Sequence, residues 1–169
     1  MTEPLVAAAT RKSGLIWVGA AGRPQVGAWH VWEDEPPAAY VLTGRGEQAL
    51  PGLAEATEAL VTVRSSDTGG RIVTWRARVE RLEPGTEDWD RVTAALLAKR
   101  LNNPDGPAAV DRWAADGAVL RLSPVEVAES GETLPAGSLA EPPRPSPATS
   151  RMHRPYQLRF WNRRRKRKS

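Results

Sequence analysis

The 169-residue chain contains no cysteine and only two histidines, His30 and His153. The lack of cysteine excludes disulfide bonds, thiolate zinc sites and cysteine nucleophiles. Two histidines are too few for a histidine metal cage, and we therefore expect no metal site.

Long apolar runs are also missing. The longest, such as residues 15–21, fall far short of the roughly 20 residues that a membrane span needs. Residues 1–12 lack the apolar core of a secretory signal peptide. We expect a soluble, cytoplasmic protein without a transmembrane segment.

Three common catalytic and nucleotide-binding motifs are absent. No Gly-Lys-Ser/Thr or Gly-x-Ser-x-Gly sequence occurs, and no helix is expected directly after Gly19–Gly22, as a dinucleotide fingerprint would require. The catalytic residues, if there are any, are unknown from the sequence. Redox chemistry would have to come from a bound cofactor, with the chain supplying position and electrostatics.

Acidic residues are absent after Glu141, whereas nine of the 24 basic residues lie in the last 19 positions. Residues 1–150 therefore carry a formal charge of −5 and the tail carries +9. Proline and serine are frequent in residues 131–150, and this composition is typical of a linker. We predict a folded domain over residues 1–130, a linker over 131–150 and a disordered basic tail over 151–169.

Aromatic residues lie among the first cations of the tail, and a compact cation run ends it. Tyr156, Phe160 and Trp161 could stack on bases or lie at a bilayer surface. The candidate polyanion-binding residues are Arg163, Arg164, Arg165, Lys166, Arg167 and Lys168. The partner could be nucleic acid or an anionic membrane, or the tail could be solvated and bind nothing.

Alternating apolar residues and turn signals predict a mainly β domain. Residues 25–32 follow a glycine-rich turn and carry bulky residues on both faces, which suits the wall of a barrel. Further strands are expected over the segments 15–18, 38–43, 60–64, 71–82 and 118–122, the last continuing at 125–127.

Helical periodicity appears in the second half of the domain. Thr86 can cap a helix that carries Trp89, Val92, Leu96 and Leu97 on one stripe. Shorter helices are expected over residues 50–58 and 108–115. This element order, without regular βαβ units, favours a small antiparallel barrel with helices packed outside it.

The chain resembles the FMN-binding split-barrel family, the pyridoxamine 5′-phosphate oxidase-like proteins that include relatives using the deazaflavin F420. The resemblance covers roughly residues 10–125 and rests on the order of several short segments. They are Gly22–Val26, Trp29–Trp32 with Asp34, Tyr40–Gly44 and Val61–Val63. The family fold is a split antiparallel β-barrel, Greek-key-like, with helices.

The resemblance implies a homodimer with FMN, or F420 as the alternative, in a cleft at the interface. Trp29, His30 and Val31 would lie along the flavin ring. The residues expected at the phosphate are Thr43, Gly44, Arg45 and Gln48. Family members often carry Ser-x-Lys or Arg-Lys in this loop, whereas this chain has Glu47 and Gln48.

Two hypotheses follow. The first is a flavin-binding split barrel, a possible oxidoreductase acting on a small organic substrate. The alternative is a dimeric barrel without cofactor, a binding module that presents the basic tail to nucleic acid or an anionic membrane.

Overall fold

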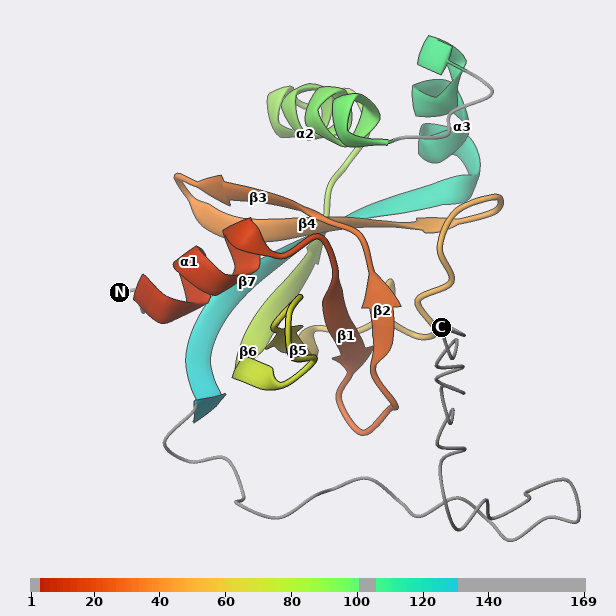
Figure 1. The fold of residues 1–169 in the computed structure, drawn as a ribbon. Helices are drawn as coiled ribbons and strands as arrows, with labels where there is room; N and C mark the ends of the chain where they lie inside the picture. The colour runs from red at the N-terminus through yellow and green to blue at the C-terminus, as the bar shows by residue number, and fades with distance from the viewer. Residues whose placement is uncertain (1–3, 101–105, 131–169) are drawn as a thin grey trace, which may run out of the picture. The chain divides into compact units, whose positions relative to one another are not determined.

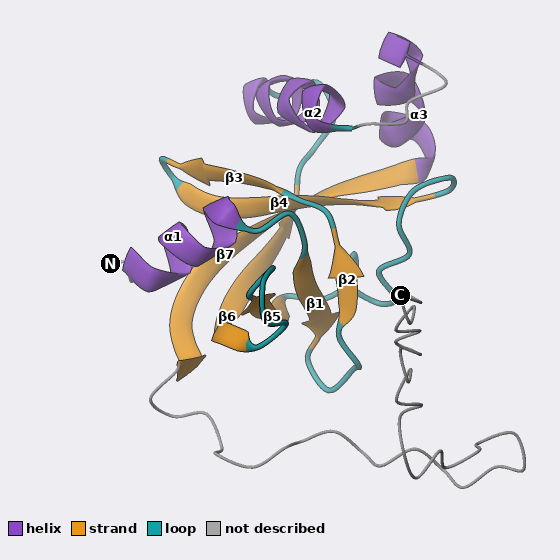
Figure 2. Ribbon diagram, viewed as in Figure 1, coloured by secondary structure: helices purple, strands orange, loops and turns teal. Residues whose placement is uncertain are grey.

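The computed structural model describes residues 4–100 and 106–130, which form one curled sheet and four helical segments (Figures 1 and 2). The helical segments are α1 (Pro4–Lys12), α2 (Glu87–Lys99), the 3-10 turn η1 (Gly106–Ala108) and α3 (Ala109–Asp116). The strands are β1 (Ile16–Ala20), β2 (Val26–Ala28), β3 (Val31–Asp34), β4 (Pro37–Gly44), β5 (Glu58–Arg64), β6 (Arg71–Arg81) and β7 (Gly117–Ser130).

The strands β2 and β3 are consecutive along the chain, yet they form opposite edges of the sheet. The strand order is β2-β1-β5-β6-β7-β4-β3, and every neighbouring pair is antiparallel. Because only Trp29 and His30 separate β2 from β3, the sheet must curl until its edges approach each other (Figure 1). The result is a barrel that is split between β2 and β3, which confirms the predicted fold class.

Two apolar cores lie on the two faces of β4. Ala39 and Val41 point into the barrel, where α1 covers one side with Val6 and Ala9. The alternate residues of β4 face the second core, under α2 and α3. Figure 1 accordingly shows α1 on one side of β4 and the other two helices on the opposite side. Double-sided burial explains why β4 is an almost continuous apolar run.

Local sequence signals gave several elements correctly. The hairpin β5–β6 lies where the alternation and the polar loop predicted it, and the strand β4 lies where the apolar run before Gly44 predicted it. The Thr86 side chain caps α2 by accepting a hydrogen bond from the Trp89 amide at 3.2 Å. Trp113 of α3 is fully buried, as expected.

Two predicted elements are wrong. Residues 25–32 do not form one strand, because β2 pairs with β1 whereas β3 pairs with β4. Residues 50–58 form no helix, because residues 51–55 are turns and Glu58 already begins β5. Gly52 there has a φ of +71°, outside the right-handed helical region, and Arg23 packs against it.

Two other elements, α1 and β7, differ from the sequence prediction. Helix α1 was not expected, although its buried Val6, Ala9 and Thr10 have helical spacing. Strand β7 continues through Pro124, beside two register shifts in its pairing with β6. Such irregularities accommodate a residue that has no N–H to donate.

The predicted linker 131–150 and tail 151–169 lie outside the described residues. Among the residues that the structure does describe, no helix is long and apolar enough to cross a membrane.

Candidate functional site

The candidate site is built around Trp29 and His30, where the chain passes from one edge of the sheet to the other. Neither residue belongs to a strand. Their backbone groups therefore need partners other than a strand ladder. The Gln48 side chain supplies both for Trp29: its Oε1 accepts from the Trp29 amide at 2.9 Å, and its Nε2 donates to the Trp29 carbonyl at 3.0 Å.

Helices α1 and α2 both bond to His30, the residue after Trp29. Lys99 of α2 donates from Nζ to the His30 carbonyl at 2.5 Å. The His30 ring is fully buried, and its Nε2 bonds the carbonyl of Thr10, in the last turn of α1, at 2.9 Å. His30 thus connects α1 with the link between β2 and β3.

Burial sets the protonation of His30. The pKa of His30 is lowered from 6.5 to about 4, chiefly because the ring is removed from water; the bond to Thr10 opposes this shift and the Lys99 charge adds to it. Its Nδ1 is buried and has no hydrogen-bond partner among the described residues. A proton there would leave a buried N–H unsatisfied, so the neutral ring, with Nε2 as donor, is the stable form.

The segment after β4 is held by its own side chains. The Thr43 hydroxyl donates to the Gln48 carbonyl at 3.0 Å and accepts from the Leu50 amide at 3.2 Å. Gly44 has a φ of +142° and lies so close to Asp116 and Gly117 that a Cβ would meet their backbone at 2.7 Å. Only glycine fits this position.

Glu47 points away from solvent, with a side chain that is 2% exposed. Its Oε1 accepts from the indole Nε1 of Trp113 at 2.8 Å and from Arg112 at 3.1 Å, and it pairs with Arg100. The carboxylate therefore joins the loop after β4 to α2 and α3. A buried charge so compensated is costly to break, typically by about 3 to 5 kcal/mol when one partner is lost.

The residues predicted to contact the flavin fall into two groups: those engaged in internal hydrogen bonds and those that are half-buried or exposed. Thr43, Gln48 and His30 are engaged in the internal hydrogen bonds described above. Trp29 and Val31 are half-buried at the margin of the core under α2 and α3. Gly44 is also half-buried, and Arg45 is exposed.

The local charge of the loop is positive. Arg100 and Arg112 both pair with one carboxylate, that of Glu47, and Arg112 also donates to the carbonyl of the exposed Arg45 at 3.0 Å. The Glu47 side chain is turned inward, so it does not present its charge beside Arg45. Sequence reasoning missed Arg100, Arg112 and Lys99, because nothing local shows which loop a helical cation will reach.

The candidate polyanion-binding residues Arg163 to Lys168 lie outside the described residues. Within the described ranges, no cluster of three or more His, Cys, Asp or Glu side chains could hold a metal ion.

Solved structures with the same architecture support the fold assignment. HutZ from Vibrio cholerae, described as a heme storage protein, aligns with a TM-score of 0.52 and 20% identity, over 73% of this chain and 90% of HutZ. An FAD-binding protein from Mesorhizobium loti aligns with a TM-score of 0.50 and 16% identity, over 75% and 90% of the two chains. A conserved hypothetical protein from Mycobacterium tuberculosis aligns with a TM-score of 0.50 and 15% identity, over 83% and 93%.

The chain therefore shares the split-barrel fold of these solved structures. The resemblance noted in the sequence is thus confirmed at the level of the fold. No protein-family model matches the sequence, and a search of curated proteins returned no match.

The buried His30 predicts a specific dependence of stability on pH. The unfolded chain takes up a proton on this histidine near pH 6.5, whereas the folded protein does so only near pH 4. Stability therefore falls as the pH drops through this window, by up to roughly 3 kcal/mol. Urea unfolding at pH 7 and pH 4.5 should show this loss in the wild type and a smaller loss in His30→Gln.

An NMR titration measures the pKa of the His30 ring directly. The ring resonance that disappears in His30→Gln belongs to His30, and its midpoint should lie well below pH 6. A midpoint near pH 6.5 would contradict the buried, neutral ring.

Proposed function

We propose that the protein is a flavin-binding split barrel, taking FMN or F420, and that it acts as an oxidoreductase on a small organic substrate. The observation that carries the proposal is the arrangement at the end of β4. There Arg45 is exposed and next to two glycines, and Glu47 is neutralised by two buried or half-buried arginines. The fold shared with the FAD-binding protein from Mesorhizobium loti adds support.

The phosphate end of a flavin fits this loop. A phosphate needs cations and hydrogen-bond donors. Arg45 supplies an exposed guanidinium, and the left-handed Gly46, with a φ of +77°, lets the backbone approach a ligand closely. Glu47 does not oppose the phosphate, because its carboxylate is turned towards Trp113.

The ring of the flavin would lie against the half-buried Trp29 and Val31, at the interface of a homodimer. Heme, which the printed description of HutZ mentions, fits less well. A heme iron needs an axial ligand such as histidine. Among the described residues the one histidine is His30, which is fully buried and has its Nε2 bonded to Thr10.

The chain's own part in such a reaction would be to bind and orient. A bound flavin would supply the electron or hydride transfer. Trp29 and Val31 would exclude water from one side of the ring, Arg45 would fix the phosphate, and Gln48 and Lys99 would keep the link between β2 and β3 in place.

Titration of the full-length protein with FMN and with F420, followed by visible absorption, tests the proposal. One of the two should bind at tens of micromolar or tighter, and Arg45→Gln should weaken it by about tenfold because a charged phosphate contact is lost. The fold should be unaffected, since only the Arg45 carbonyl contacts Arg112.

The matched control is Arg78→Gln. Arg78 is exposed on β6 and forms no ion pair with the described residues. It should leave flavin affinity unchanged. Failure of both cofactors to bind, or an Arg45→Gln variant that binds like the control, would refute the proposal.

The alternative function is a barrel without cofactor that presents the basic tail to a polyanion. The internal engagement of Thr43 and Gln48 favours it, because these polar groups already have partners within the chain. Under this alternative the barrel is a dimeric scaffold, and residues 163–168 bind nucleic acid or an anionic membrane.

Binding to duplex DNA and to anionic vesicles tests the tail. Association should fall steeply with salt, because about one counterion is released per neutralised phosphate, and truncation after Ser150 should abolish it. Replacing Phe160 and Trp161 by Ala should weaken vesicle binding far more than DNA binding. Equally poor binding by full-length and truncated protein at low salt would exclude this role.

A further inference from the structure

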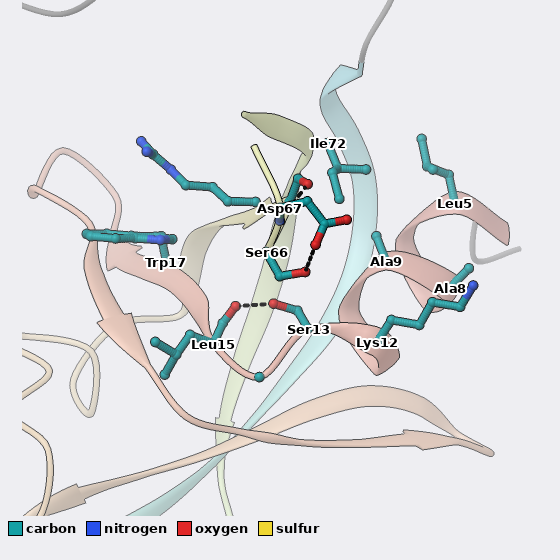
Figure 3. Close-up of a pocket in the computed structure, with 13 residues that line it drawn as sticks. Leu5, Ala8, Ala9, Lys12, Ser13, Leu15, Trp17, Ser66, Asp67 and Ile72 are labelled. Atoms are coloured by element: carbon teal, nitrogen blue, oxygen red, sulfur yellow. Dashed lines mark hydrogen bonds between the residues drawn. The ribbon is translucent and has the colours of Figure 1, made fainter. Parts of the chain in front are cut away.

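A hollow of about 620 Å³ lies between α1, the start of β1 and the loop that joins β5 to β6 (Figure 3). Its volume is within the range of small-molecule sites, roughly 300 to 1,000 Å³. The residues of the flavin site at the end of β4 do not line it.

The walls of the hollow are unusually apolar for exposed surface. Three of the four large hydrophobic residues that are exposed in the described chain line it: Leu5 (37% exposed), Leu15 (55%) and Trp17 (37%). Exposed apolar residues that gather around one hollow are a feature of interaction and ligand sites.

Cations accompany this apolar surface. The Arg64 guanidinium lies over the Trp17 indole, 5.1 Å from the ring centroid, and Lys12 lines the α1 side of the hollow. Neither side chain forms an ion pair with the described residues, whereas Arg11, Arg71 and Arg76 all do. Within the described residues, Arg64 and Lys12 therefore have no carboxylate partner and are available to pair with an anion.

One carboxylate, that of Asp67, lies in the same hollow. It accepts a hydrogen bond from Ser66 at 3.3 Å, and Figure 3 shows the two side chains turned towards each other. The lining thus carries two positive charges and one negative charge. A ligand with a single negative charge complements this balance.

We propose that this hollow binds a small planar aromatic carboxylate. The ring would pack against Leu15 and the Trp17–Arg64 stack, because a guanidinium plane stacks well on aromatic surfaces. The carboxylate would pair with Arg64 or Lys12. The site is separate from the proposed flavin site and does not depend on it.

Calorimetric titration of the full-length protein with 2-naphthoate, and with the neutral 2-naphthamide of the same shape, tests this. The acid should bind with a dissociation constant below about 1 mM and the amide several-fold more weakly. Arg64→Gln should weaken naphthoate roughly three- to tenfold, since it removes both the charge and the stacked plane. Asp67→Asn should tighten it, because a like charge is removed.

Two controls separate this site from the rest of the molecule. Arg78→Gln removes an equally exposed strand cation outside the hollow and should leave naphthoate binding unchanged. Arg45→Gln should also leave it unchanged while it weakens FMN, so failure of the flavin proposal and failure of this one are distinguishable.

Several results would overturn the proposal. They are equal affinity for acid and amide, no binding of naphthoate at about 5 mM, an Arg64→Gln variant that behaves like Arg78→Gln, or displacement of naphthoate by FMN. Shielding of the Trp17 indole in proportion to protein concentration would show that a second copy of the chain covers the hollow, which would also overturn it.

Discussion

The structure depends on how two residues, Trp29 and His30, cross from one edge of the sheet to the other. A curled sheet whose edge strands are joined by so short a link leaves polar backbone groups without a strand neighbour. Gln48 bonds both backbone groups of Trp29, and Lys99 bonds the carbonyl of His30. The link is thereby tied to the loop after β4 and to α2, and through the His30 ring to α1.

The same constraint shapes the candidate site. Gln48 can hold Trp29 only if its loop is fixed, and Glu47 fixes it through Trp113, Arg112 and Arg100. Glu47, a carboxylate in the loop that was expected to bind an anionic phosphate, therefore stabilises the scaffold. Arg45, on the exposed side of this loop, is left available for a ligand.

The elements that were predicted correctly are those whose signals lie in residues close together in the sequence. Alternation placed the β5–β6 hairpin, and a capping threonine with an apolar stripe placed α2. The break between β2 and β3 could not be predicted, because residues 25–32 are apolar on both faces and their partner strands are distant in the chain. The predicted site residues at the end of β4 do lie together, but the tasks of Gln48 and Glu47 depend on partners 19 and 66 positions away.

The most direct test of this account is native-state hydrogen exchange at the Trp29 amide. The account predicts that this amide is protected in the wild type and loses most of its protection in Gln48→Leu, because the side-chain acceptor is removed. The amides of the β5–β6 hairpin should stay protected in the same variant. An unprotected Trp29 amide in the wild type, or unchanged protection in Gln48→Leu, would contradict the proposed role of Gln48 in holding the barrel together.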